Sequence, residues 1–316
     1  MNDILVSIVC LTYNHEKYIQ QTLESFMNQK TNFNFEIIIH DDASTDNTKK
    51  IIMQYAEKFP KIIKPIFQKE NQYSKGISIP TQILLPYIRG KYIAICEGDD
   101  YWVDNNKLQI QIDFLESNSE YGACVHNTYG EDIKSGEKKL LYPYKMDKDI
   151  YLKDVIEFGG QSYQSSSLVY KKEFLFNRPT FFNIMTDIGV EDYPLAIFLA
   201  LNGKIRYIAK PMSVYRLMTE NSWTKQNSNS DQLINIYNHT IIMLDNINEY
   251  TQFKYDNMIN KVILRNEYKI NELLHNFKIL RQRKYHAIWN DKSISFRIKR
   301  KLYAYFGNII IKIKKN

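Results

Sequence analysis

Apolar runs of strand length alternate with amphipathic segments along the first 130 residues. The runs that we predict to be buried strands are residues 4–11, 35–40, 62–67, 92–96 and 121–128. The segments between them place apolar residues at helical spacing, as in Ile19, Leu23 and Phe26. Strands that alternate with helices in this way predict an α/β fold with an open sheet, flanking helices and right-handed crossovers.

Shorter elements follow after residue 130. We predict a hairpin over residues 139–146, strands over 165–170, 205–208 and 213–216, and helices over 80–87 and 191–201. Residues 231–285 are helical in character and contain neither glycine nor proline. The predicted domains are a sheet domain, residues 1–225, with a nucleotide-binding half (1–105) and an acceptor half (106–225), and a helical C-terminal region, residues 226–316.

The positive charge is concentrated at the C-terminal end of the chain. The formal net charge is +7, and residues 292–316 carry eight Lys and Arg residues and no acidic residue. The remainder is close to neutral, so the charge does not indicate a nucleic-acid partner. The tail also contains many apolar residues, which leaves two interpretations open: a solvated basic helix end, or a peripheral contact with an anionic membrane.

Cysteine spacing and hydrophobicity bear on the compartment. Cys10, Cys96 and Cys124 lie in apolar runs without CxxC spacing, so we expect buried free thiols. The N-terminus lacks the basic start of a signal peptide, and no apolar stretch reaches the ~18–20 residues of a membrane span. We therefore expect a cytoplasmic protein, with the tail at the inner face of the membrane as the second interpretation above.

Three polar clusters follow predicted strands at the points where the strands end. They are Thr12-Tyr13-Asn14, Asp41-Asp42, and the stretch from Glu97 to Asp100. Ligands of open α/β sheets bind outside the carboxyl ends of the strands. We therefore expect the three clusters to form one strongly acidic crevice.

An acidic crevice would repel a phosphorylated ligand unless a cation lay between them. Hard divalent cations bind carboxylate and phosphate oxygens together, and Glu97-x-Asp99 has the spacing of a metal-binding pair. A solvated acidic turn would explain this stretch alone, but not the two other polar strand ends. The chain contains no GxGxxG, P-loop, HExxH or GxSxG motif, which excludes the signatures of dinucleotide-binding domains, P-loop NTPases, zinc proteases and α/β-hydrolases.

These motifs, in this order and spacing, resemble those of family 2 glycosyltransferases, which have the Rossmann-like GT-A fold. Residues 6–14 (VSIVCLTYN) resemble the opening strand of that family, residues 40–46 (HDDASTD) its V-D-D-G-S-T-D stretch, and residues 97–102 (EGDDYW) its D-x-D-D-x-W metal motif. Two positions depart from the pattern. Glu97 stands where the family more often has aspartate, and Ala43 replaces the usual glycine.

The resemblance implies roles for the residues at the strand ends. Asp99 would bind Mn²⁺ or Mg²⁺, and Glu97 would face the ribose of the donor. The other donor-binding residues that it implies are Thr12, Tyr13 and Asn14 around the base and ribose, Asp42 with Asp41 at a uracil-type base, and Asn71 in place of a family segment that is not apparent here.

Four more candidates lie further along the chain, together with one at the end of the metal motif. Glu191-Asp192 resembles the E-D motif of the family, whose aspartate is the catalytic base, although a carboxylate at a helix N-terminus is also a common cap. Arg216 resembles the arginine of a loop that closes over the diphosphate, with a structural ion pair as the alternative. Trp102 and Trp223 are candidates for stacking on acceptor sugars, and a core position is the alternative for each.

The resemblance therefore implies an inverting, metal-dependent glycosyltransferase of bacterial surface polysaccharide synthesis. It would transfer a sugar from a nucleotide-sugar donor, UDP-linked by family analogy, to a hydroxyl of a carbohydrate or lipid-linked glycan acceptor. Two alternatives stay open. A catalytically silent nucleotide-sugar-binding module would not need the intact acidic set, and a metal-dependent nucleotidyltransferase would carry a glycine-rich basic loop after the first strand.

Overall fold

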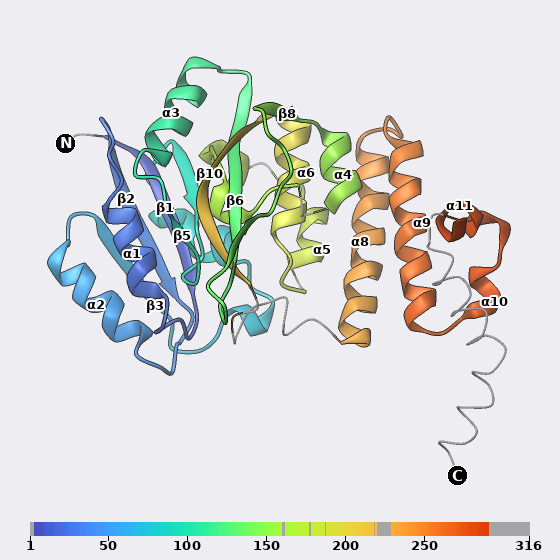
Figure 1. The fold of residues 1–316 in the computed structure, drawn as a ribbon, viewed down its shortest axis with the longest axis horizontal. Coiled ribbons are helices and arrows are strands. Elements are labelled where there is room, and N and C mark those ends of the chain that lie inside the picture. The colour runs from blue at the N-terminus through green and yellow to red at the C-terminus, as the bar shows by residue number, and fades with distance from the viewer. Residues whose placement is uncertain are drawn as a thin grey trace, which may run out of the picture. The chain divides into compact units, whose positions relative to one another are not determined.

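The computed structural model describes residues 3–290 except for 160–161, 177, 187, 218 and 220–228 (Figure 1). Contacts between residues divide the chain into two compact units, residues 1–227 and residues 228–316. Within the described residues, the first unit contains all of the strands, and the second unit is helical.

The first unit is built on one open, mixed sheet. Its ten strands are β1 (Ile4–Thr12), β2 (Asn34–Asp41), β3 (Ile63–Phe67), β4 (Tyr92–Ile95), β5 (Tyr101–Trp102), β6 (Tyr121–Asp132), β7 (Lys138–Leu140), β8 (Lys148–Ile150), β9 (Val169–Lys171) and β10 (Lys204–Leu217). They run in the order β3-β2-β1-β4-β9-β6-β10-β5, with β7 paired to β6 and β8 to β10. The neighbouring strands β3, β2, β1 and β4 are parallel to one another, whereas β9 is antiparallel to both of its neighbours, β4 and β6.

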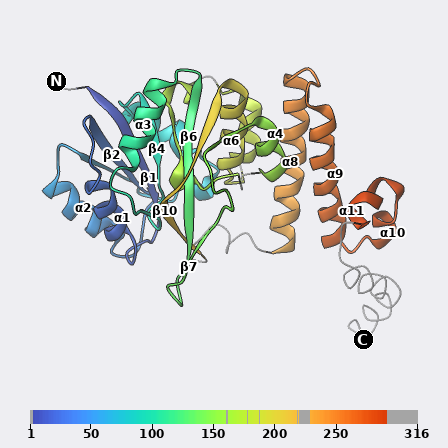
Figure 2. The ribbon, with the colours of Figure 1, turned by 45° about the horizontal axis from the view of Figure 1, so that its top comes forward.

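Helices flank this sheet. They are α1 (Ile19–Met27), α2 (Thr48–Lys58), α3 (Lys107–Ser117), α4 (Leu152–Phe158), α5 (Asn183–Thr186) and α6 (Asp192–Asn202). Figures 1 and 2 show α1 and α2 beside β1 to β3, and α4 and α6 on the side of β6 and β10. The predicted α/β architecture, an open mixed sheet flanked by helices, is confirmed.

The main core lies between one face of the parallel strands and the helices α1 and α3. Alternate residues of β1, β2 and β4 point into it, because successive side chains of a strand point to opposite faces. α1 contributes Ile19, Leu23 and Phe26, which are fully buried and lie about one helical turn apart, and α3 contributes Leu108 and Ile112. The three cysteines lie in this core as free, buried thiols.

Strand register brings the three polar clusters to one edge of the sheet. In the parallel pairing of β1 with β2, Thr12 lies opposite Asp41. The amide of Asp42 donates a hydrogen bond to the carbonyl of Thr12 (3.0 Å), and the amide of Gly98 donates to the carbonyl of Leu11 (2.8 Å). These bonds attach the turns after β2 and β4 to the end of β1, so the clusters meet as the sequence predicts.

Several short elements differ from the prediction. Residues 204–217 form one strand rather than two. The strand continues through Pro211, which has no amide to donate, because its register with β6 shifts on both sides of that residue. The hairpin expected over residues 139–146 does not form, since β7 pairs with β6 and β8 pairs with β10. Two prolines limit residues 79–87 to short π and 3₁₀ turns, and a 3₁₀ turn at Ser165–Ser167 leaves only a short β9.

A buried carboxylate links three strands and the loop before β4. Glu36 of β2 is fully buried and accepts hydrogen bonds from Ser7 Oγ (2.7 Å), Lys64 Nζ (2.9 Å), and the Nε (2.8 Å) and amide (3.0 Å) of Arg89. Burial alone would raise the pKa of Glu36. The hydrogen bonds from Arg89, Lys64 and Ser7 outweigh this effect, so its pKa lies below the ordinary value.

Replacing Glu36 with glutamine is expected to lower the free energy of unfolding by about 2–3 kcal/mol, because a buried acceptor of charged donors is lost. A depressed pKa stabilises the native state above the unfolded pKa of about 4.3, so the difference from wild type should be full near neutral pH and shrink in more acidic buffer. Urea unfolding at a series of pH values measures both. Glu70→Gln, which removes an exposed ion pair with Lys75, should leave the midpoint unchanged; equal effects of the two variants would contradict the prediction.

The second unit consists of helices in its described part. They are α8 (Ser230–Tyr250), α9 (Asp256–Leu273), α10 (Phe277–Leu280) and α11 (His286–Asn290). α8 and α9 pack against each other, and the side chain of Asn229 caps α8 by accepting the amide of Gln232 (2.9 Å). Among the helices in the described ranges, none combines the length and the apolar character needed to cross a membrane.

Candidate active site

Two turns with left-handed backbone lie at the ends of β1 and β2. Asn14 (φ 55°) follows β1, and Ala43 (φ 64°) follows β2. Asparagine tolerates this conformation, whereas for alanine it costs about 1–2 kcal/mol. The turns hold each other, since Ser44 Oγ accepts the amide of Asn14 (2.8 Å) and Asn14 Oδ1 accepts the amide of Thr45 (2.8 Å). These contacts accommodate alanine where the family pattern has glycine.

The two aspartates after β2 have different partners. Asp41 is 1% exposed and accepts a hydrogen bond from Ser44, and burial raises its pKa. Asp42 instead accepts the backbone amides of Gln72 (2.8 Å) and Tyr73 (3.0 Å). Asp41 thus shapes its own turn, and Asp42 positions the loop after β3. Because a carboxylate offers about four acceptor positions, base recognition by Asp42 stays a prediction.

The loop held by Asp42 also contacts the turn before α6. Asn71 Nδ2 donates to the carbonyl of Asp42 (3.3 Å), and Tyr73 Oη donates to the carbonyl of Gly189 (3.2 Å). Gly189 has a positive φ of 73°, and a Cβ at this position would lie 1.9 Å from Tyr73 Oη. Only glycine therefore allows this contact, which connects the loop after β3 to the start of α6.

α6 begins with the acidic pair Glu191-Asp192. Pro194 fits in its first turn, where helix amides have no helical partner. Asp192 keeps an exposed surface, yet protein atoms crowd the carboxylate, and this burial raises its pKa. Burial also raises the pKa of Glu191, against the lowering effects of Ser78 and Arg178.

Three carboxylates converge where these elements meet. The pKa of Glu97 is raised to about 8, first by burial and then by the negative charges of Asp192 and Asp99. Ser165 Oγ donates to Glu97 Oε2 (2.9 Å) and opposes this shift. The negative charges of Asp99, at the end of a strand, and of Asp192, at the start of a helix, both act on Glu97. The three carboxylates therefore belong to one acidic site.

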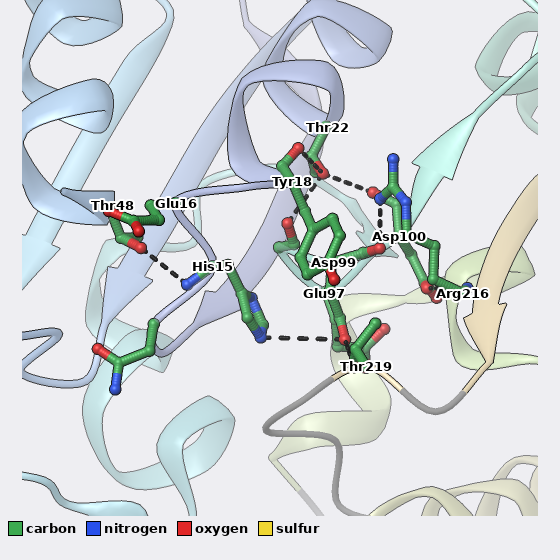
Figure 3. Close-up of polar contacts among 12 residues, drawn as sticks. His15, Glu16, Tyr18, Thr22, Thr48, Glu97, Asp99, Asp100, Arg216 and Thr219 are labelled. Carbon is green, nitrogen blue, oxygen red and sulfur yellow. Dashed lines mark hydrogen bonds and ion pairs between the residues drawn. The ribbon is translucent and has the colours of Figure 1, made fainter. Parts of the chain in front are cut away.

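Asp99 lies at the centre of this site (Figure 3). Its Oδ2 accepts a hydrogen bond from Thr219 Oγ1 (2.9 Å) and lies 3.9 Å from His15 Nε2. Burial lowers the pKa of His15, against the raising effect of Asp99. A Cβ at Gly98 would lie 2.7 Å from Thr12 Oγ1 and 2.8 Å from His15 Nδ1, so this glycine lets both side chains pack against the turn.

Arg216 lies in strand β10, as the strand predicted over residues 213–216 has it, and not on the loop that the resemblance implied. It is 6% exposed, and its guanidinium lies 4.9 Å from the ring centre of Tyr18 and 4.4 Å from that of Tyr101. It also donates to the carbonyl of Asp99 (Figure 3) and to Oε1 of Gln21. A guanidinium engaged in this way would have to leave these partners to bind a diphosphate.

Two hollows open beside the carboxylates. The His15 hollow, of about 260 Å³, is lined by Asn14, His15, Glu16, Lys17, Tyr18, Thr45, Asp46 and Thr219. The Asp192 hollow, of about 10 Å³, has room for about one water molecule and is lined by Gly159, Ser162, Tyr163, Ser165, Leu168, Asp192, Leu195 and Ala196. The site therefore has one recess next to His15 and Asp99 and another next to Asp192.

A comparison with protein families decides what kind of protein carries this site. The model of glycosyl transferase family 2 matches residues 7–176, which include all three strand-end clusters. The chain belongs to glycosyl transferase family 2. The resemblance seen in the sequence motifs is thereby confirmed.

Bacterial proteins are among its relatives. The chain is 33% identical over 221 residues to the uncharacterised protein Rv1520 of Mycobacterium tuberculosis, covering 69% of this chain and 60% of the relative. It is 34% identical over 119 residues to the Escherichia coli UDP-Glc:alpha-D-GlcNAc-diphosphoundecaprenol beta-1,3-glucosyltransferase WfgD, covering 38% of this chain and 44% of the relative. The chain thus spans only part of the length of these relatives.

Solved structures share the fold. Residues 1–349 of S. aureus TarS in complex with UDP superpose with a TM-score of 0.55 at 16% identity, covering 92% of this chain and 76% of TarS. The mannosyltransferase PcManGT from Pyrobaculum calidifontis, in complex with GDP-Man and Mn²⁺, gives a TM-score of 0.55 at 16% identity, covering 99% of this chain and 88% of PcManGT. At this identity the likeness concerns the fold alone, and it confirms the predicted GT-A fold.

The structure corrects the predicted role of one tryptophan. Trp102 is 4% exposed, its ring centre lies 4.6 Å from that of Phe26, and its Nε1 donates to the carbonyl of Ser166 (2.9 Å). A ring covered in this way has no free face for a sugar, so Trp102 is a core residue. Trp223 and the basic tail, residues 292–316, lie outside the described residues.

The structure also adds site residues that the sequence analysis did not select. His15 directly follows the first polar cluster. Its position at a strand end could therefore have identified it as a candidate site residue. Ser165 and Thr219 reach Glu97 and Asp99 from distant parts of the chain. No local pattern marks them, because only the fold of the chain brings them to the site.

Proposed function

We propose that the chain is an inverting glycosyltransferase that transfers a sugar from a UDP-linked donor to a hydroxyl of a carbohydrate or lipid-linked glycan acceptor. The convergence of Asp99, Glu97 and Asp192 carries this proposal, because it joins a carboxylate suited to a metal–diphosphate group with one suited to accept a proton. The presence of UDP in the TarS complex and the name of WfgD, which gives UDP-Glc as donor and a diphosphoundecaprenol acceptor, support the substrate classes.

The end of β4 fits a divalent cation. Asp99 offers a carboxylate that Thr219 fixes by a hydrogen bond, as is typical of metal-binding carboxylates. In the described ranges, no three His, Cys, Asp or Glu side chains are grouped so that they could hold a metal ion by themselves. Donor phosphates and water would therefore complete the coordination of Mn²⁺ or Mg²⁺. When bound, the cation would offset the charge of the leaving diphosphate, and PcManGT was solved with Mn²⁺.

Asp192 supplies the proton acceptor of the proposed reaction. The acceptor oxygen forms a bond to the anomeric carbon while the bond from that carbon to the phosphate oxygen breaks. The electron pair of the broken bond leaves with the nucleoside diphosphate, the hydroxyl proton passes to Asp192, and a single displacement inverts the configuration. A raised pKa suits this role, because a general base works best when its pKa lies nearer the operating pH.

The acceptor would bind beside Asp192. The lining of the Asp192 hollow combines serine hydroxyls with the ring of Tyr163, and sugar pockets commonly pair apolar surface with a few placed polar groups. The hollow has room for only about one water molecule, so the side chains around it would have to move to admit a sugar. The basic residues 292–316 would suit an anionic membrane surface, where a lipid-linked acceptor lies.

Calorimetric titration with UDP, GDP and dTDP, with and without Mn²⁺, tests the donor site. We expect UDP to bind in the presence of Mn²⁺, and its affinity to fall at least tenfold, by about 1.4 kcal/mol, when the metal is removed with a chelator. Equal affinity for UDP with and without Mn²⁺ would contradict the proposed metal dependence. Tighter binding of GDP or dTDP would contradict the proposal that the donor is UDP-linked. A folded protein that binds none of the nucleotides would overturn the proposed function.

A further inference from the structure

One histidine faces the proposed metal ligand Asp99 at the distance of an ion pair, without a hydrogen bond to it. His15 Nε2 points at Asp99 Oδ2 across 3.9 Å (Figure 3). This gap is too long for a hydrogen bond, which requires about 2.7–3.2 Å. It is close to twice the ~2.1 Å of a metal–nitrogen or metal–oxygen bond. A cation bound off the line between the two atoms, with one bond to each, would therefore fit at this separation.

The position of His15 is fixed by its surroundings. Its amide donates to Thr48 Oγ1 (2.8 Å), which anchors the turn after β1 to the start of α2. Its ring packs over Gly98, with Nδ1 buried and without a hydrogen-bond partner among the described residues. Thr12 Oγ1, against the same glycine, is a second buried atom for which the described part of the chain offers no partner. The ring is thus held with Nδ1 on the protein side and Nε2 toward Asp99 and the His15 hollow.

We propose that His15 is a second protein ligand, beside Asp99, of the divalent cation that accompanies the donor. The inference rests on the proposed function and deepens it. Imidazole nitrogen favours first-row transition metals, whereas Mg²⁺ takes oxygen ligands almost entirely. His15 therefore gives the site a preference for Mn²⁺ over Mg²⁺ that an all-carboxylate site would lack. Thr219 fixes the Asp99 carboxylate and supports the same geometry.

The alternative is that His15 donates a hydrogen bond from Nε2 to a phosphate of the donor. Both arrangements use the same ring position, but only one puts nitrogen in the coordination sphere of the metal. A measurement that detects the metal–nitrogen bond therefore separates them, and catalytic activity is not needed for it.

Electron paramagnetic resonance of Mn²⁺ with the full chain and UDP supplies that measurement. Loss of the free-ion signal gives the Mn²⁺ affinity, and electron spin echo modulation reports a directly bound ¹⁴N. We expect nitrogen coupling in the wild type that disappears in His15→Asn, together with a fall in Mn²⁺ affinity of about 10–100-fold. His239→Asn is the matched control, because His239 is a half-buried histidine of α8 whose Nδ1 lies 2.8 Å from the carbonyl of Asn235, and this variant should keep both signals. Competition with Mg²⁺ should show a weaker preference for Mn²⁺ in His15→Asn.

The outcomes separate this inference from the proposed function. Mn²⁺ that binds with UDP but shows no nitrogen coupling in the wild type would overturn the role of His15 and leave the donor site in place. Absence of any UDP-dependent Mn²⁺ binding would overturn the proposed function as well. Since the wild-type spectrum alone decides whether nitrogen is bound, a variant that fails to fold would not hide the answer, and His15→Gln provides a second replacement for assigning the signal.

Discussion

Asp192→Asn is expected to lower kcat by about 10²–10⁴-fold and to leave Mn²⁺-dependent UDP binding in place. Asparagine has nearly the same shape but cannot take the acceptor proton, so the loss falls on the chemical step. The substitution also removes one of the two charges that raise the pKa of Glu97, which should therefore decrease. Release of UDP from a UDP-sugar, with an acceptor found by screening, measures kcat, and calorimetry measures binding.

The neighbouring carboxylate provides the matched comparison. Glu191 precedes Asp192, and its negative charge is stabilised by Ser78 and Arg178. It therefore has partners outside the site. We expect Glu191→Gln to lower kcat much less than Asp192→Asn. A large loss in Glu191→Gln together with near-normal turnover in Asp192→Asn would assign the base to Glu191 instead. Loss of UDP binding in Asp192→Asn would show that this residue acts on the donor rather than on the acceptor proton.

The parts of the fold that the sequence predicts are those where one physical cause dominates. The strands β1, β2 and β4 are buried on both faces in a parallel arrangement, so they appear as continuous apolar runs. Their carboxyl ends lie at one edge of the sheet, which is why Thr12, Asp42 and Asp99 could be placed together in advance. Chain segments far apart in sequence meet there because register, rather than local sequence, aligns them.

Side-chain roles that depend on the direction of one side chain were harder to predict. The sequence marks Arg216 and Trp102 as candidate ligand contacts because arginine and tryptophan often have that role. In the structure, two tyrosine rings cover the guanidinium of Arg216, and the ring of Trp102 packs on Phe26. The approach of His15 to Asp99 depends on the turn after β1 and on Gly98. Gly98 lies far from His15 in the sequence, so no local pattern predicts this approach.

Asp99→Asn is expected to abolish the effect of Mn²⁺ on UDP affinity and to lower kcat/KM by about 10³-fold or more. The cation would contribute several kcal/mol to stabilising the leaving diphosphate, and each 1.4 kcal/mol corresponds to a factor of ten in rate. Asparagine can still accept the hydrogen bond from Thr219 Oγ1, so we expect no loss of fold. Calorimetry with and without Mn²⁺ and steady-state kinetics measure the two effects.

Glu97→Gln shows why this loss belongs to Asp99 and not to negative charge at the site in general. The pKa of Glu97 is about 8 in the absence of donor and metal, so most molecules carry it protonated at neutral pH, and glutamine resembles that form. We therefore expect Glu97→Gln to keep a Mn²⁺-dependent UDP affinity and to lose far less activity than Asp99→Asn. If the two variants lost metal dependence equally, the cation would be held by the pair. Normal turnover in Asp99→Asn would remove the metal from the proposed mechanism, because no other carboxylate in the described site lies beside both His15 and Thr219.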